Sequence, residues 1–303
     1  MLTMIMQGAS SFLFSSGVPL FIIMTGYLNI YKTAFNRRYV NGMTRVLLAY
    51  VFFSIITFGF KGYTGMETWS LVTLVKGILD FSMIEYAWYI EMWIGLYLLT
   101  PYLNIGYNAI PDRRMKRILI LILFMLTAIP YFANRYEQHL MPAFWMGIYP
   151  VLFFMIGRYI KEYQPIVKRW KLGAIVLSIC MINPLFSTFF VKDRPMMYIA
   201  GDPWGVLGVV VAVCTFLFFY RADIKLIVLK WCVTKISLLS LDIYLCCYMV
   251  DKMVYPYFIG RYYENQQQFG RWFFVIVPLV LLISAIIAQF KEWLFAVLRL
   301  NKL

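Results

Sequence analysis

Nine apolar stretches follow one another along the chain, separated by short polar loops. Most approach the roughly 20 mostly apolar residues that a helix needs to cross a bilayer. A further stretch at 68–82 is shorter and is interrupted by Lys76 and Asp80, which predicts an interfacial or re-entrant helix. The pattern predicts an all-α, polytopic membrane protein that forms a single domain over 1–303. The nine expected transmembrane helices cover 10–31, 45–60, 84–105, 117–134, 141–160, 172–191, 203–221, 234–251 and 272–292.

Composition agrees with this pattern. Hydrophobic residues make up 62% of the 303 positions and charged residues 14%, and the mean hydropathy is +0.74. Soluble domains are usually about 45–50% apolar and about 25% charged. A net charge of +14 is also typical of nucleic-acid-binding proteins. Here the basic residues lie in short loops between apolar segments, so we expect the lipid bilayer, and no nucleic acid, as partner.

The distribution of basic residues predicts the orientation in the membrane. Most of the 28 lysines and arginines fall in alternate loops, around 32–45, 113–117, 158–171, 221–235 and 291–302. Cytoplasmic loops carry such an excess. We therefore expect a cell-membrane protein with a cytoplasmic C-terminus. Nine crossings then place the first residue on the outer side of the membrane. A simple explanation for this unusual position is that one helix is missing from the start of the sequence.

Two of the fourteen acidic residues fall in the interior of predicted spans, away from loops and span ends: Glu91 in 84–105 and Asp242 in 234–251. A charged group in hydrocarbon is costly and normally faces a cavity or a partner. Glu91 and Asp242 are thus candidates to line a pocket or orient a catalytic base, and the alternative is a pairing that serves packing alone. The single histidine, His139, lies in a predicted outer loop, where solvation is the simpler explanation.

The predicted cytoplasmic loop 32–45 carries Arg37, Arg38 and Arg45. Arginine presents a fork of donors that suits phosphate groups, such as those of coenzyme A. The alternative is that these residues only set the orientation in the membrane. The five cysteines show no metal-ligand spacing, so we expect no metal and interpret them as small apolar side chains. Walker, GxSxG and HExxH patterns are absent from the sequence.

Four segments resemble the acyltransferase 3 family of membrane O-acyltransferases. SSGVPLFIIMTGYL (15–28) resembles the family's VPLFFMISGYL, and RVLLAY (45–50) its Arg-Ile-Leu-x-Pro-Tyr. AWYIEMWIGLYLLTPYLN (87–104) is the most specific match, to LWYLYxLIGLYLLxPxL. SLDIYLCCY (240–248) is similar to SFGIYLIHP. The four segments keep the family's order and spacing over most of the chain.

The resemblance implies a ten-helix core and transfer of an acyl group, such as acetyl from acetyl-CoA, to a hydroxyl of a cell-surface polysaccharide or lipid-linked sugar. It implies that Arg45, helped by Arg37 and Arg38, binds the phosphates of the donor. Trp88, Tyr89 and Tyr244 are expected to shape the pocket.

The chain departs from the family pattern at several positions. The family's first helix carries an arginine and the histidine regarded as catalytic, and we expect that helix, and with it the histidine base, to be missing from the sequence given. Two other family histidines correspond to Tyr86 and Cys247 in this sequence. The family also has a cytoplasmic Arg-x-x-Arg pattern; here Gly42 replaces its first arginine, and Arg45 is its second. Two other functions therefore stay open: a transporter or flippase of a lipid-linked sugar, and a catalytically inactive partner of a glycan-assembly complex.

Overall fold

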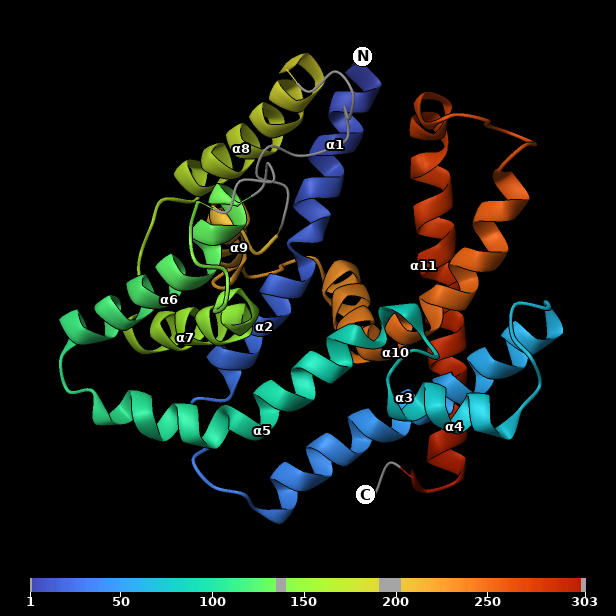
Figure 1. Ribbon diagram of the computed structural model, residues 1–303, viewed down its shortest axis with the longest axis horizontal. Coiled ribbons are helices and arrows are strands. Elements are labelled where there is room, and N and C mark those ends of the chain that lie inside the picture. Colours follow the sequence, from blue (N-terminus) through green and yellow to red (C-terminus); the bar gives the residue numbers. More distant parts are fainter. Residues whose placement is uncertain (1, 135–139, 191–202, 301–303) are drawn as a thin grey trace. The chain divides into compact units, whose positions relative to one another are not determined.

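The computed structural model describes residues 2–134, 140–190 and 203–300, and it is built from helices (Figure 1). No strand occurs in those ranges apart from an isolated bridge between Ile259 and Tyr263. The α-helices are α1 (Leu2–Ser15), α2 (Gly17–Leu28), α3 (Arg37–Tyr63), α4 (Leu71–Leu79), α5 (Trp88–Ala109), α6 (Arg113–Ala133), α7 (Tyr149–Tyr163), α8 (Arg169–Phe190), α9 (Val206–Phe219), α10 (Ile227–Phe258) and α11 (Gln266–Val297). Two 3₁₀ turns, η1 (Glu85–Ala87) and η2 (Met146–Ile148), precede α5 and α7.

Each predicted transmembrane segment contains all or most of one observed helix or, for 10–31, the end of α1 and all of α2. The break between α1 and α2 has a local cause. Pro19 has no N–H to donate to the carbonyl of Ser15, and the Ser16 hydroxyl instead bonds the Leu13 carbonyl at 2.5 Å. The all-α prediction is therefore confirmed for the described part of the chain.

Five helical segments in the described ranges are long and apolar enough to cross a membrane, as judged by length and composition. They are Ile5–Leu28, Arg37–Tyr63, Arg113–Ala133, Ile227–Phe258 and Gln268–Val297. The helices α7 and α9, predicted as spans, have 15 and 14 residues. At a rise of about 1.5 Å per residue, either is shorter than the roughly 30 Å hydrocarbon core. The count of nine spans stays a prediction.

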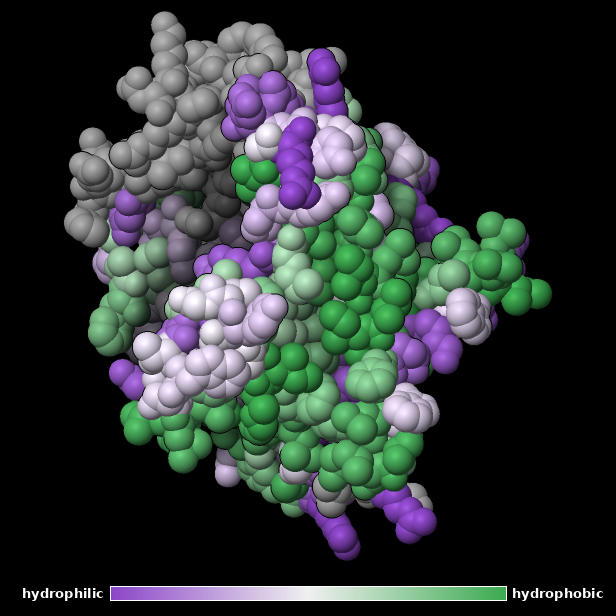
Figure 2. All heavy atoms as spheres, turned by 90° about the vertical axis from the view of Figure 1, so that its right-hand side faces the viewer, coloured by the Kyte–Doolittle hydropathy of each residue, from purple (hydrophilic) through white to green (hydrophobic). Residues whose placement is uncertain are grey.

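Large apolar side chains remain exposed along the candidate spans. On α11 the exposed residues include Phe274, Leu282, Ile286 and Phe290. Figure 2 shows extended hydrophobic areas on the face that it presents. Monomeric soluble proteins rarely expose contiguous apolar patches of this kind. This surface is what a helix in contact with lipid requires.

Contacts divide the chain into two compact units, each built from two segments. The first unit comprises Met1–Ala34 and Leu98–Asp223, and the second comprises Phe35–Tyr97 and Ile224–Leu303. Each unit has its own buried core: Phe12, Cys180 and Val211 belong to the first, and Tyr50 and Leu245 to the second. The single domain over 1–303 stays a prediction, and each unit is described by itself.

In the first unit, α2 and α7 approach closely through two glycines. A Cβ atom added at Gly26 would collide with the Phe154 carbonyl, and one added at Gly157 would collide with the Ile23 carbonyl. Small residues allow membrane helices to pack backbone against backbone in this way. The crossing brings Arg158, the residue after Gly157, toward the loop that follows α2.

We expect Gly157→Ala to lower the free energy of unfolding by about 1–3 kcal/mol, because the added methyl group overpacks this crossing. Gly59→Ala on α3 is the matched control, since a Cβ at Gly59 meets nothing within 4 Å. Thermal unfolding in detergent, followed by tryptophan fluorescence, measures both variants. An unchanged melting temperature for Gly157→Ala would contradict the close approach of α2 and α7.

The helix α4 occupies the stretch predicted to form a short interfacial helix. Leu71, Val72 and Leu79 are exposed on it, and the Tyr50 hydroxyl of α3 donates to the Ile78 carbonyl at 3.0 Å. At its end, hydrogen bonds from the Ser82 hydroxyl and amide hold the pKa of the Asp80 carboxyl below its usual value. The helix is thus observed, and its position at a membrane interface stays a prediction.

Candidate active site

The arginines predicted to bind the donor lie on the first three turns of α3. Asn36 caps this helix, because its side chain accepts the Tyr39 amide at 2.8 Å. Arg38 and Arg45 are both exposed and lie two helical turns apart, on one face. Arg37 is the first residue of the helix and is also exposed. Three positive charges therefore occupy the end of a helix whose N-terminus itself attracts anions.

The structure explains why glycine stands at position 42, between these arginines. A Cβ atom there would lie 2.9 Å from the Tyr97 hydroxyl oxygen. The Tyr97 ring stacks on Tyr39, with centroids 4.2 Å apart, and on Trp93 at 4.6 Å. The Tyr39 hydroxyl donates to the Tyr97 carbonyl, and the Tyr97 hydroxyl donates to the Tyr39 carbonyl at 3.2 Å. An arginine at position 42 would displace this aromatic stack.

Two of the predicted pocket residues, Tyr89 and Tyr244, meet in the second unit with ring centroids 5.7 Å apart. The Tyr244 hydroxyl donates to the Tyr86 carbonyl at 2.5 Å. Trp88, the third, packs edge-on against Tyr89 at 6.4 Å and is partly exposed. Tyr86, Tyr89 and Tyr244 are half-buried. The start of α5 and the middle of α10 thus form an aromatic surface.

Asp251, which is not among the residues predicted from the sequence, completes this surface. The Tyr86 hydroxyl donates to its Oδ2 at 2.8 Å. The predicted span ended at 251, whereas α10 continues to Phe258, so Asp251 is a half-buried residue within the helix. The sequence does contain a signal that places Asp251 in this cluster. Asp251 follows Tyr244 by seven residues and Cys247 by four, and residues at these spacings share a helix face.

The two positions that correspond to the other family histidines, Tyr86 and Cys247, both belong to this cluster. Tyr86 bonds Asp251, and the Cys247 thiol donates to the Tyr244 carbonyl at 3.0 Å. We call Tyr86, Tyr89, Tyr244, Cys247 and Asp251 the tyrosine–aspartate cluster. It combines aromatic faces with a carboxylate that can accept a proton.

Glu91 lies in the first turn of α5, because the helix begins at Trp88 rather than at 84. Its side chain is exposed. A carboxylate in the first turn is favoured by the helix dipole. Glu91 follows Trp88 by three residues and therefore lies on the same face of α5.

Asp242 forms an ion pair with Lys291 between α10 and α11. The Lys291 Nζ lies 3.0 Å from Oδ1 and 3.1 Å from Oδ2 of Asp242, and 2.9 Å from Oε1 of Glu292. Asp242 is 4% exposed and Lys291 6%. The carboxylate of Asp242 is therefore engaged by a buried partner, the arrangement expected for a packing role.

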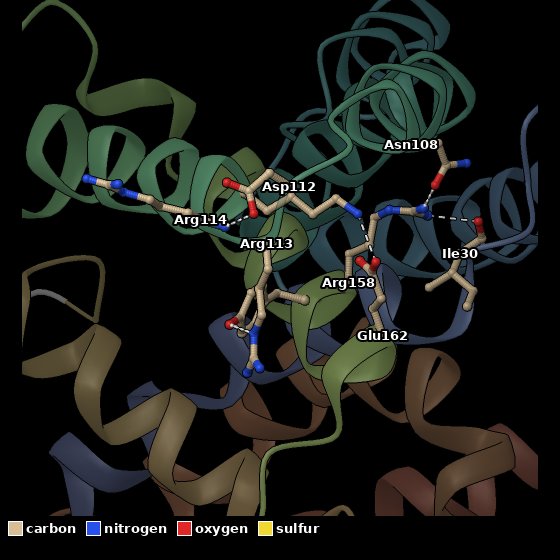
Figure 3. Close-up of polar contacts among 9 residues, drawn as sticks. Ile30, Asn108, Asp112, Arg113, Arg114, Arg158 and Glu162 are labelled. Carbon is tan, nitrogen blue, oxygen red and sulfur yellow. Dashed lines mark hydrogen bonds and ion pairs between the residues drawn. The ribbon is translucent and has the colours of Figure 1, made fainter.

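A second polar cluster lies in the first unit, around the buried Arg158 of α7 (Figure 3). Arg158 Nη1 donates to the Ile30 carbonyl at 2.8 Å and to Asn104 Oδ1 at 2.6 Å, and Nη2 donates to Asn108. Asn104 in turn donates to the carbonyls of Asn29 and Lys32. Arg158 thus holds the start of the loop that leads from α2 toward the arginines of α3.

Beside Arg158, Lys116 and Glu162 form an ion pair of 2.8 Å between α6 and α7. Both cations lie close to the buried Tyr107 ring: Lys116 Nζ is 4.6 Å and the Arg158 guanidinium 4.7 Å from its centroid. This cluster fastens α5, α6 and α7 together. None of its residues was predicted from the sequence, because they come from three separate segments.

The remaining sequence predictions concern cysteines, metals and His139. Cys180, Cys214 and Cys246 are buried, Cys232 and Cys247 are half-buried, and all five are free. Among the described residues, no group of three or more His, Cys, Asp and Glu side chains has the arrangement of a metal site. His139 lies outside the described residues.

A family model of the acyltransferase domain (Acyl_transf_3) matches residues 2–289. The chain belongs to the acyltransferase 3 family. The resemblance drawn from the four sequence segments is therefore confirmed. Neither the curated proteins nor the solved structures that were compared with the chain gave a match.

Family membership and the apolar helices together identify a membrane protein of an acyltransferase type. In this acyltransferase-3 protein, the α3 arginines and the tyrosine–aspartate cluster both belong to the second unit. The first unit contributes the Arg158 cluster. The geometry of the second unit is the basis for assigning roles to residues.

Proposed function

We propose that the protein transfers an acyl group, acetyl in the simplest case, from acyl-CoA to a hydroxyl of a cell-surface polysaccharide or lipid-linked sugar. It acts in the cell membrane with its C-terminus in the cytoplasm. The observation that carries the proposal is the tyrosine–aspartate cluster, where Asp251 and Tyr86 are bonded at 2.8 Å within a half-buried aromatic surface of a family member.

The acceptor side of the reaction is assigned to this cluster. Tyrosine rings offer apolar faces that pack on the C–H surface of a sugar ring, and their hydroxyls bond its polar edge. Trp88 and Glu91 extend the same part of α5 and are assigned to the rim of the site. An ionisable residue within a membrane helix is by default a functional candidate, and Asp251 is the one that meets the tyrosines.

The chemistry follows from the carboxylate of Asp251. The acceptor hydroxyl donates to it, its oxygen attacks the thioester carbonyl carbon, and its proton passes to Asp251. A C–O bond forms, the C–S bond breaks, and the proton is returned to the departing thiolate, which gives an ester and free coenzyme A. General-base assistance of this kind contributes about 10²–10⁴-fold to a rate.

The donor side is assigned to α3. Its N-terminal arginines bind the phosphates, while Lys61 near its other end lies 5.6 Å from the Tyr248 ring, beside the tyrosine–aspartate cluster. From Arg45 to Lys61 the helix rises about 24 Å. Coenzyme A carries its phosphates and its thioester at opposite ends of an extended molecule. A donor lying along α3 would therefore place the acyl group near the acceptor.

We expect Arg38→Gln and Arg45→Gln each to raise KM for acetyl-CoA about tenfold, with little change in kcat. Each removes a charge-assisted bond that is equally present in ground state and transition state. Steady-state transfer of labelled acetyl by the purified protein measures this. Lys235→Gln, an exposed basic residue on α10, is the control. A fall in kcat at constant KM would contradict the assignment of these arginines to donor binding.

The proposed function itself is tested by deleting the gene and measuring O-acetyl groups on the surface glycans by NMR. We expect one class of acetyl signals to disappear and to return when the wild-type gene is restored. Unchanged acetylation in cells that produce the glycan would overturn the proposal. If acetylation is unchanged and a lipid-linked sugar accumulates facing the cytoplasm, the result would favour a transporter instead.

A further inference from the structure

In the first unit, α6, α7 and α9 enclose an apolar groove of about 420 Å³. Its walls include Ile120 and Phe124 of α6, Ile156 of α7, and Val209 and Val213 of α9. Among the described residues that line the groove, Arg117 and Tyr159 carry polar side chains, and both lie at one end. The groove is separate from the residues to which acyl transfer is assigned.

The groove is long enough to extend through most of one leaflet. On α9 the lining residues extend from Val209 to Leu217, and on α7 from Leu152 to Ile160. Either distance corresponds to about 12 Å along a helix axis. Half of the roughly 30 Å hydrocarbon core is about 15 Å. A chain that enters beside Arg117 would therefore run through most of one leaflet.

Positive charge gathers at the polar end. Arg113, one turn before Arg117 on α6, donates its Nε–H to the Tyr159 hydroxyl at 3.0 Å (Figure 3), and its guanidinium lies 4.5 Å from the centroid of Tyr163. The far end is lined by Phe124, Leu152 and Val209. An apolar channel with cationic groups at one mouth is complementary to an amphipathic anion.

The groove opens toward a surface suited to lipid. On α6, which is a candidate membrane span, Ile118, Leu121, Ile122 and Met125 are exposed. Leu121, which also lines the groove, is 55% exposed. A lipid in the bilayer can thus reach the groove from the side.

We propose that this groove binds one anionic phospholipid, with an acyl chain along α6, α7 and α9 and the headgroup phosphate at Arg117 and Arg113. The charge at the mouth selects the headgroup, since a basic residue near a membrane surface favours an anionic lipid. The apolar walls hold the chain. This inference does not depend on the proposed acyl transfer.

The test is lipid binding by the purified full chain in neutral detergent, measured by native mass spectrometry with phosphatidylglycerol and with phosphatidylcholine. We expect phosphatidylglycerol to bind more tightly. Arg117→Gln is expected to weaken it about fivefold, and Ile120→Trp, which fills the groove, to abolish the preference. Arg114→Gln and Ile122→Trp are matched controls on the same helix, at exposed positions outside the lining, and should leave binding within about twofold of wild type.

Equal binding of the two lipids, or an unchanged affinity in Arg117→Gln, would overturn the proposal. Displacement of phosphatidylglycerol by equimolar palmitoyl-CoA would also overturn it, by assigning the groove to a long-chain acyl donor. If Ile120→Trp fails to fold, the affinity of Arg117→Gln for phosphatidylglycerol still decides the test.

Discussion

Replacing Asp251 with asparagine is expected to lower the rate of acyl transfer by about 10²–10⁴-fold, because the amide cannot accept the proton of the acceptor hydroxyl. The amide still accepts the hydrogen bond from Tyr86, so the cluster should keep its geometry. Transfer of labelled acetyl from acetyl-CoA to the isolated glycan acceptor measures the rate. The acid limb of the pH–rate profile should disappear in the variant.

Two further variants separate chemistry from structure at Asp251. Tyr86→Phe removes the hydroxyl that orients the carboxylate and should lower the rate less than Asp251→Asn does. Asp223→Asn changes an exposed carboxylate of the first unit and should leave the rate unchanged. More than half of the wild-type rate in Asp251→Asn would refute its role as base, and would leave the family assignment intact.

Lys291→Met is expected to give the largest loss of stability, about 3–5 kcal/mol, because it leaves the Asp242 carboxylate buried without its partner. The double variant Asp242→Asn with Lys291→Met should recover most of this loss, since both charges are then removed. Thermal unfolding in detergent measures each variant. Glu292→Gln is the control, because the Glu292 side chain is 38% exposed and its pairing is expected to contribute at most about 1 kcal/mol.

The same double variant tests the role of Asp242, which the sequence made a catalytic candidate. Acyl transfer by a folded Asp242→Asn, Lys291→Met protein at the wild-type rate would assign the ion pair to packing. Loss of transfer in that folded protein would give Asp242 a part in the reaction. A single Lys291→Met variant as stable as wild type would contradict the buried pair itself.

The sequence by itself determined the elements and the family. Apolar length and periodicity are local properties, so the observed helices fall where hydropathy placed them. The motif segments around Trp88 and Tyr244 identified the family, because they keep its order and spacing. Hydropathy does not determine helix ends: the predicted span ends at Asp251, whereas α10 continues to Phe258.

The tertiary structure decided which polar groups meet. Glu91 and Asp242 were equivalent in the sequence, since both are acids in apolar stretches. In the structure Asp242 pairs with Lys291, 49 residues further along the chain, and Glu91 is exposed in a first helical turn. The bond between Tyr86 and Asp251 joins residues 165 positions apart. Such pairings depend on how helices pack against one another, which hydropathy along a single chain does not encode.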